Sequence, residues 1–285
     1  PVIGFVIFGL VPMVVSLMLS FTNVKGSILD DFTFVGFANF AYLVKNANFL
    51  KSMRNTLFYL LNVPLSLAVG LFIAYLVNKA GTGNKFFRSV FFIPYVCSTV
   101  SISIAWKIMY DADYGIINTI LGSFGVDKIG WISTPQTFML SVIIMSVWKG
   151  TGLCIILYQA ALANVNQSYY ESAKIDGASP MRIFFTITLP AVSPTTFYLL
   201  TMKIIGSLQV MEEPDILSGG DETMSGLDWA DMTVVKFLYK TFSGGWNSLG
   251  FGVGSAAALI LTLFILVVTY VNFAMGKKWV NYDMA

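Results

Sequence analysis

Long apolar stretches alternate with shorter polar connections along the whole chain. Six of the stretches approach the length of about 20 residues that a helix needs to cross a bilayer. They cover residues 1–21, 56–77, 87–108, 138–161, 191–211 and 249–275. Because an unpaired backbone is too costly in lipid, each stretch is predicted to be helical. Pro64, Pro94 and Pro194 are expected to mark kinks or helix ends. The pattern predicts an all-α integral membrane protein, with one transmembrane domain over 1–285 and a core of about 52–275.

Composition agrees with a membrane protein. The chain is 56% hydrophobic and 11% charged, with a mean hydropathy of +0.74, whereas soluble domains carry about 25% charged residues. It has no histidine, the commonest general base and metal ligand. Cys97 and Cys154 both lie in apolar stretches and are interpreted as small core residues rather than a disulfide or metal pair. No catalytic or metal-binding residues are predicted.

The charged residues divide the connections into two sets. One set comprises links 78–86 and 162–190 with the tail after 275, and the other comprises 22–55, 109–137 and 212–248. Counting Arg88 at the adjoining span edge, the first set holds 7 basic and 3 acidic residues, and the second holds 7 and 12. Because the first set is about half as long, its basic density is higher. The positive-inside rule therefore places this set, and both termini, in the cytoplasm.

A polar stretch at residues 168–190 interrupts the apolar pattern and is predicted to form two short helices joined by a sharp turn. Ser168 is expected to cap the first helix, and Glu171, three residues later, to complete a capping box. Gly177 is expected to supply the positive φ that ends this helix.

The second short helix has its own boundary residues. Ser179 is expected to cap it, with Pro180 at its first position, where a missing N–H costs nothing. Pro190 is expected to end it. The i, i+3, i+4 spacing predicts one shared apolar face, formed by Met181, Phe184 and Phe185. A short, capped helix pair between membrane spans is typical of an element that another protein contacts.

The 168–190 stretch also carries a long, spaced motif. Its elements are Glu171-Ser172-Ala173, Asp176-Gly177-Ala178, Phe184 and Ile187-Thr188-Leu189-Pro190. The motif resembles the "EAA" loop of ABC importer permeases, most closely the carbohydrate-uptake, maltose-type subunits. One departure is Ser172, where the family pattern has Ala. Weaker matches follow in the family's order at Val35–Phe40, Arg54–Thr56, Arg88, Phe92–Pro94, Gly115, Asn118, Gly206–Gln209 and Leu217–Gly220.

The resemblance implies a type I ABC importer permease with six transmembrane helices in a bacterial inner membrane. It implies a second homologous permease, two ATPase subunits, an extracytoplasmic solute-binding protein and a saccharide substrate. The sequence lacks the GxxxxGK[ST] phosphate loop, so ATP and Mg would bind to the partner ATPases and no cofactor to this chain. The residues expected to couple to the ATPase are Tyr170, Glu171, Ala173, Asp176, Gly177, Ala178, Met181, Phe184 and Phe185. For Glu171 and Gly177, capping and helix termination are a compatible structural role.

Two lysines near the middle of predicted spans are the sharpest anomalies. A charge at Lys149 or Lys203 costs at least a few kcal/mol in lipid, so each is expected to face a bundle interior, a cavity or a partner. Lys107, nearer a span end, is expected to snorkel to the membrane interface. The tentative substrate path comprises Trp148, Lys149, Lys203, Gly206, Gln209 and Glu212. Alternatives are an interface anchor for Trp148 and close helix packing at Gly206.

One alternative function stays open, and two others lack the sequence features that they require. The same machinery could carry an anionic cargo, such as a uronate oligosaccharide or glycerol phosphate, and the two lysines motivate this alternative. A secondary transporter would favour inverted repeats or an ionisable relay, and neither is evident. A membrane-embedded enzyme would need a cluster of acids, bases or metal ligands, which the sequence lacks. No feature indicates nucleic-acid binding.

Overall fold

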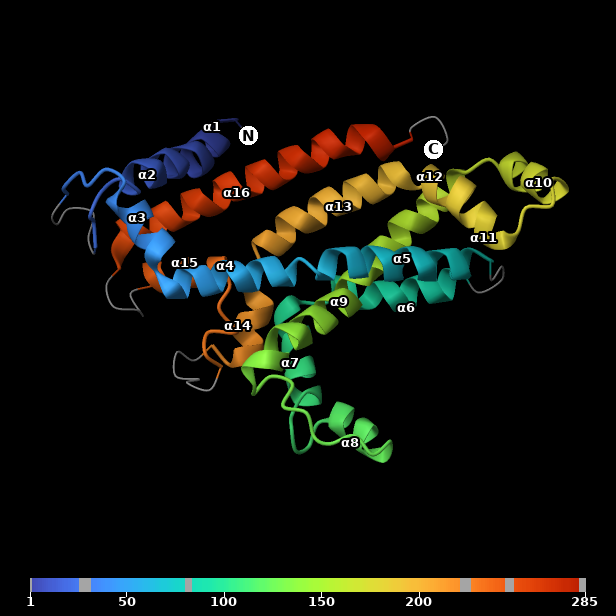
Figure 1. The fold of residues 1–285 in the computed structure, drawn as a ribbon, viewed down its shortest axis with the longest axis horizontal. Coiled ribbons are helices and arrows are strands. Elements are labelled where there is room, and N and C mark those ends of the chain that lie inside the picture. Colours follow the sequence, from blue (N-terminus) through green and yellow to red (C-terminus); the bar gives the residue numbers. More distant parts are fainter. Residues whose placement is uncertain (1, 26–31, 80–83, 221–226, 244–248, 282–285) are drawn as a thin grey trace. The chain divides into compact units, whose positions relative to one another are not determined.

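The computed structural model describes residues 2–25, 32–79, 84–220, 227–243 and 249–281. These residues are almost entirely helical, and their only β-pairing is an isolated bridge between Thr22 and Phe34. The all-α prediction is confirmed. Figure 1 shows the helices in chain order: α1 (Val2–Phe5), η1 (Val6–Leu10), α2 (Val11–Leu19), α3 (Ala38–Lys45), α4 (Ala47–Tyr59), α5 (Asn62–Lys79), α6 (Asn84–Val96), α7 (Thr99–Met109), α8 (Ile116–Ser123), α9 (Pro135–Asn164), α10 (Gln167–Ile175), α11 (Pro180–Ile183), η2 (Phe184–Thr188), α12 (Leu189–Ala191), α13 (Ser193–Leu208), α14 (Glu212–Ser218), α15 (Val234–Phe242) and α16 (Gly250–Trp279).

Each predicted span corresponds to helical structure. The span at 87–108 is broken in its middle, and the span at 191–211 is preceded by a bent helical arm, Pro180–Ala191, that belongs to the 168–190 segment. Within the described residues, four continuous helical stretches are long and apolar enough to cross a membrane: Val2–Leu19, Ala47–Asn78, Pro135–Asn164 and Gly250–Trp279. Two bent pairs bring the total to six if each pair is one span. Phe86–Val96 and Thr99–Met109 meet at 96°, and Pro180–Ala191 and Ser193–Leu208 meet at 64°.

Of the three prolines that are predicted to mark kinks or helix ends, one lies near a bend and two lie at helix starts. Pro94 lies inside α6, and the 96° break follows at Cys97 and Ser98, a few residues after it. Pro64 and Pro194 lie in the first turns of α5 and α13, where a missing N–H leaves no helical hydrogen bond unmade. The two prolines therefore stand at helix starts, as expected of helix-end positions.

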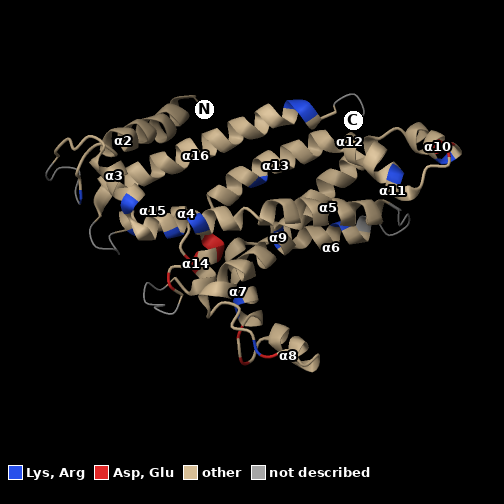
Figure 2. Cartoon of the chain, viewed as in Figure 1, with Lys and Arg blue, Asp and Glu red and all other residues tan. Residues whose placement is uncertain are grey.

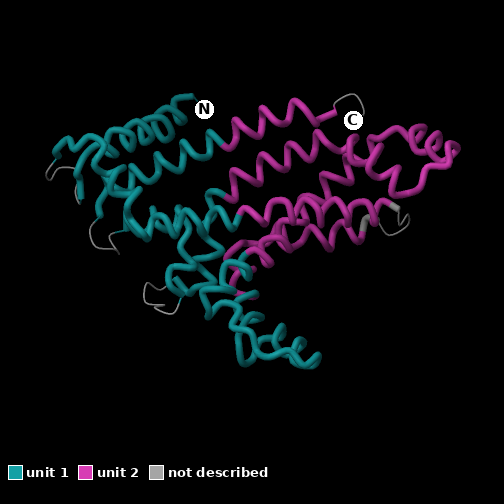
Figure 3. Tube along the Cα trace, viewed as in Figure 1, with its two compact units in different colours: residues 1–59, 106–142, 208–267 teal, residues 60–105, 143–207, 268–285 magenta. Residues whose placement is uncertain are grey.

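The described residues form two compact units, each made from separate chain segments (Figure 3). Unit 1 comprises residues 1–59, 106–142 and 208–267, and unit 2 comprises 60–105, 143–207 and 268–285. Both are therefore assembled from parts of the chain that are distant in sequence.

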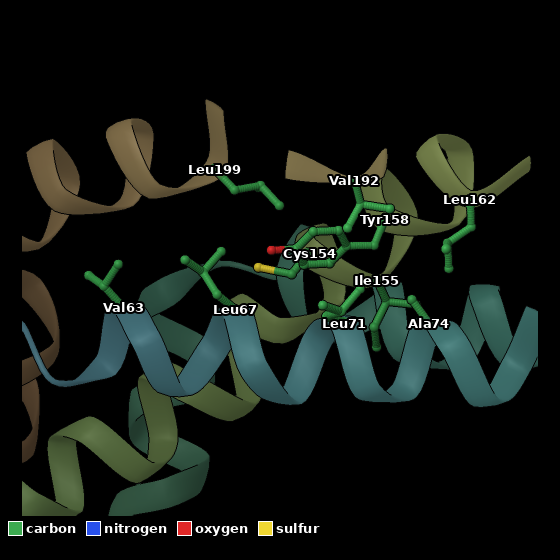
Figure 4. Packing of buried hydrophobic residues seen from close by; sticks show 10 residues of the cluster. All are labelled: Val63, Leu67, Leu71, Ala74, Cys154, Ile155, Tyr158, Leu162, Val192 and Leu199. Atoms are coloured by element: carbon green, nitrogen blue, oxygen red, sulfur yellow. The ribbon is translucent and has the colours of Figure 1, made fainter. Parts of the chain in front are cut away.

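The core of unit 2 joins α5, α9 and α13. Along α5, buried side chains recur every three or four residues, so they share one helix face. Figure 4 shows these side chains, Val63, Leu67, Leu71 and Ala74, directed toward Cys154, Ile155 and Tyr158 of α9. A Cβ placed on Gly70 would overlap the Cβ of Cys154. Glycine therefore permits the close approach of α5 and α9.

Unit 1 has a second apolar core, formed by α3, α4, α15 and α16. Leu43, Phe49, Phe237 and Ala257 are buried in it. A loop of the same unit, between α7 and α9, is organised by polar contacts instead. There the backbone amides of Tyr114 and Asp113 donate to Asp111 at 2.9 Å and lower the pKa of that carboxyl group.

The polar stretch at 168–190 forms two short helical elements, as predicted. The residue that caps the first of them differs from the prediction. Asn166, not Ser168, caps α10, and its side chain accepts a hydrogen bond from the Ser168 backbone amide. The capping box at Ser168 and Glu171 was therefore a wrong prediction: asparagine is as good a cap as serine, and the chain reaches it first. Gly177 has a φ of +73°, which confirms its role as helix terminator.

The second short element begins as predicted and ends later than predicted. The Ser179 side chain accepts from the Arg182 amide, and Pro180 follows at the first helical position. Pro190 does not end the element, because the chain widens into the π-helical turn η2 and continues through α12 to Ala191. The wider turn accommodates a proline that cannot donate to the ladder.

Candidate functional site

The 168–190 segment exposes apolar side chains. Ile175 is 86% exposed, Met181 67% and Phe185 56%. Glu171, Asp176 and Gly177 are also exposed, whereas Ala173 and Ala178 are half-buried. Single exposed apolar side chains are common, but three within eleven residues of a capped polar loop are a candidate contact surface for another protein.

Two of the predicted coupling residues face inward. The Phe184 ring meets the Tyr75 ring of α5 edge-on, with centroids 5.2 Å apart, and Phe184 packs against the buried core of unit 2. The Tyr170 hydroxyl lies 3.3 Å from the Thr188 hydroxyl, within hydrogen-bond distance. These contacts fix the segment to the helices of its own unit. The predicted face of Met181, Phe184 and Phe185 is thus divided between the exterior and the core.

The two lysines of the tentative substrate path contact different residues. Lys149, on α9, is half-buried and donates a hydrogen bond to the Thr99 hydroxyl at the start of α7. Lys203, on α13, is also half-buried. A Cβ built on Gly150 would lie 2.5 Å from the Lys203 ammonium nitrogen and 3.7 Å from the Ser66 hydroxyl. Lys203 thus reaches a surface of α9 and α5 that a larger residue at position 150 would fill.

The remaining four residues of the tentative substrate path are exposed. A Cβ at Gly206 would meet no atom within 4 Å, so this glycine does not mark close helix packing. Trp148 is 47% exposed. Gln209 follows the end of α13, and Glu212 begins α14; both are exposed. The structure brings Lys203 to α9 within unit 2, which also contains Trp148, Lys149 and Gly206, whereas Gln209 and Glu212 belong to unit 1.

Sequence reasoning missed a buried ionic cluster in unit 1. Lys236 is 1% exposed, and its ammonium nitrogen lies 2.7 Å from Asp231 Oδ2 and 3.0 Å from Asp215 Oδ1. Figure 2 shows acidic residues on α14, which contributes Asp215. The charge count treated all three residues as ordinary loop charges. An available signal was the position of Lys236 between the apolar residues Val234 and Phe237 of α15.

Lys107, which is predicted to snorkel to the membrane interface, has a specific partner in the fold. Its ammonium nitrogen lies 3.4 Å from the Ile216 carbonyl oxygen of α14, to which it donates. The negative end of a helix dipole attracts a cation, which accounts for this position.

Comparison with known proteins identifies the family. The family model described as "binding-protein-dependent transport system inner membrane component" matches residues 66–280. The chain is 32% identical to YesP, a probable ABC transporter permease of Bacillus subtilis, over 99% of this chain and 89% of that protein. It is 30% identical to the arabinooligosaccharide transport permease AraP of the same organism, over 98% and 86%.

Solved structures share the fold. A chain of a bacterial alginate ABC transporter, crystallised with an alginate-bound periplasmic protein, superposes with a TM-score of 0.83. The sequences are 23% identical, and the match covers 97% of this chain and 91% of the other. The predicted ABC importer permease fold is confirmed. The chain belongs to the inner membrane components of binding-protein-dependent transport systems.

Proposed function

We propose that this chain is one permease subunit of an ABC importer that carries a sugar or oligosaccharide by alternating access. The observation that carries the proposal is the family match across residues 66–280. Sugar and oligosaccharide permeases recur among its relatives, including transporters for arabinooligosaccharides, for trehalose and maltose, and for lactose. The working assembly contains a second homologous permease, two ATPase subunits that bind ATP and Mg, and an extracytoplasmic solute-binding protein. Both termini face the cytoplasm, as the distribution of basic residues favours.

The 168–190 segment is the contact with the ATPase. Ile175, Met181 and Phe185 supply exposed apolar side chains of the kind that dock a helix in a groove. Phe184 supplies the connection to the core of the permease, because its ring packs against Tyr75 of α5. An ATPase that binds the segment differently in its open and closed states would shift the equilibrium of the attached helices.

The test of this role uses the complete importer in proteoliposomes. Met181→Asp combined with Phe185→Ser should lower ATPase co-purification and stimulated hydrolysis at least tenfold, because it places a charge and a polar group on the apolar contact. The permease pair should still assemble, since both side chains are exposed. Tyr239→Ser is the matched control, because Tyr239 is a 53% exposed aromatic residue on α15, outside the segment. Normal ATPase binding and hydrolysis by the double variant would contradict the proposed contact.

An anionic saccharide is a second candidate cargo. Lys149 and Lys203 are half-buried cations on α9 and α13, and an ammonium group can pair with a carboxylate or donate to a hydroxyl. Lys203 favours a cargo contact because no carboxylate among the described residues forms an ion pair with it. Both neutral and acidic sugars offer acceptors for it.

A further inference from the structure

The connection between α13 and α16 is built around a buried ammonium group. Besides its ion pairs with Asp215 and Asp231, Lys236 donates to the Ser218 hydroxyl at 2.9 Å. A buried charge is costly unless it is paired and hydrogen-bonded. Lys236 is therefore satisfied only while the last turn of α14 and the start of α15 remain together.

Two more lysines contact the same end of α14. Lys107, from α7, donates to the Ile216 carbonyl oxygen at 3.4 Å, and Lys240, from α15, donates to the Gly220 carbonyl oxygen at 3.2 Å. The carbonyl end of a helix carries partial negative charge, so ammonium groups stabilise it. With Lys236, three cations from two other helices hold the C-terminal end of α14.

The chain around this cluster is anchored to neighbouring helices as well. The Thr233 hydroxyl donates to the Val210 carbonyl oxygen at 2.7 Å, just after α13. The Asn55 side chain of α4 donates to the carbonyl oxygens of Trp229 and Met232, at 2.7 and 3.0 Å. Trp229 has a φ of +67°, a left-handed conformation that persists for such a residue only where surrounding contacts impose it.

We propose that Lys236 is a positioning residue that joins α14 to α15, and that, with the contacts of Thr233 and Lys107, it keeps these helices, the end of α13 and the end of α7 together as one rigid body during the transport cycle. Separating Lys236 from its two carboxylates would leave its buried ammonium group without a counter-charge, so the body moves as a whole rather than coming apart when the permease changes state. The inference rests on the proposed importer function. It assigns to this cluster the role of holding two separate stretches of unit 1, residues 106–142 and 208–267, in fixed positions.

The experiment measures amide hydrogen exchange in the complete importer, in the resting and ATP-trapped states, together with uptake. In the unmodified importer, exchange over residues 212–220 should stay equally slow in both states. Lys236→Met should speed this exchange at least tenfold and lower maximal uptake at least fivefold. The binding-protein concentration for half-maximal uptake should stay unchanged, because the cluster is internal.

A second variant separates positioning from simple charge balance. Lys236→Met with Asp215→Asn and Asp231→Asn removes the unpaired carboxylates, so the importer as a whole should stay folded, while exchange over 212–220 stays fast and uptake stays low. Recovery of uptake in this variant would overturn the proposal, since Lys236 would then serve only to neutralise charge. Faster exchange over 212–220 in the trapped, unmodified importer would also overturn it, and this measurement needs no variant.

Lys51→Met is the matched control. Lys51 forms an ion pair with Asp228 at 2.6 Å in the same unit, but the two side chains are 42% and 71% exposed, and solvent-exposed pairs contribute little. This variant should leave exchange over 212–220 and uptake unchanged. If the unmodified importer fails to take up any saccharide, the proposed function is wrong. If it transports normally and Lys236→Met does too, the positioning role alone is wrong.

Discussion

Asn118 organises the loop between α7 and α9 with a single amide side chain. Its amide nitrogen donates to the carbonyl oxygens of Ala112 and Ile129, at 3.1 and 2.9 Å. Its oxygen accepts from the Ile129 amide at 3.3 Å and the Trp131 indole at 2.9 Å. Two donors and one oxygen with two lone pairs are the full capacity of the group. The side chain is 7% exposed, so water cannot readily replace these partners.

Replacing Asn118 by Leu should therefore destabilise the loop by about 3 kcal/mol, the upper part of the range for leaving buried partners unsatisfied. The midpoint of unfolding in detergent should fall, and Trp131 fluorescence should shift to the red in the folded protein. Ser123→Ala, on the exposed part of α8, should change neither. An unaltered midpoint for Asn118→Leu would show that the loop does not depend on this residue.

The sequence predicted some of the residues that begin and end the short helices at 168–190, but it did not predict the buried ion pairs of Lys236. Ser179, Pro180 and Gly177 are recognisable because their roles depend on nearest neighbours in the chain. The role of Lys236 depends on Asp215, twenty-one positions earlier. A loop charge and a buried ion pair have the same sequence pattern until the fold places the partners.

Among the elements, the break between α6 and α7 is the largest departure from a simple membrane helix. The two parts meet at 96°, with Cys97 and Ser98 between them. Irregular backbone at membrane depth persists only where protein or a water-filled cavity covers it. Cys97 is exposed in the isolated chain, whereas Cys154 is buried between α5 and α9.

These positions predict the reactivity of the two thiols. In the detergent-solubilised chain, a water-soluble maleimide should modify one cysteine, Cys97, because only its thiol is accessible. In denaturant it should modify both cysteines. Mass spectrometry of the labelled peptides gives the answer, and Cys97→Ser should leave the folded protein unlabelled. Equal labelling of Cys154 in the folded state would contradict the packing of α5 on α9.

Hydrophobic runs predicted the membrane helices but not their bends. Pro94 is expected to mark a kink or helix end in the stretch at 87–108, but neither it nor the serines that follow Cys97 predict the position or the 96° angle of the break. Helix α9 extends beyond the predicted 138–161 to Pro135–Asn164, because polar residues can continue a helix outside the lipid. Hydropathy reports the lipid environment, whereas bends and ends depend on packing and caps.

At the scale of the whole transporter, Lys203 distinguishes the possible cargoes. Lys203→Met should lower uptake of the transported saccharide about tenfold, because a charge-assisted hydrogen bond contributes about 1.5–3 kcal/mol. Uptake of matched neutral and uronate oligosaccharides by reconstituted importer provides the measurement. Lys277→Met, at the exposed end of α16, is the control.

The same measurement separates the two candidate cargoes. Import of neutral oligosaccharides alone would exclude the anionic alternative, and import of uronates alone would support it. Unchanged uptake by Lys203→Met would show that the lysine does not contact cargo. The family could be inferred from the motif at 168–190, because the residues of that motif are close together in sequence. The cargo residues could not, because they come from separate helices.

The bent pair at 180–208 has a mechanical consequence. Its first arm, Pro180–Ala191, has 12 residues and its second, Ser193–Leu208, has 16, or about 18 and 24 Å of helix. Val192, the residue between them, is fully buried. Both arms also contribute to the core of unit 2, through Phe184 and Leu199. A displacement of the first arm would therefore be transmitted to the second arm through closely packed side chains.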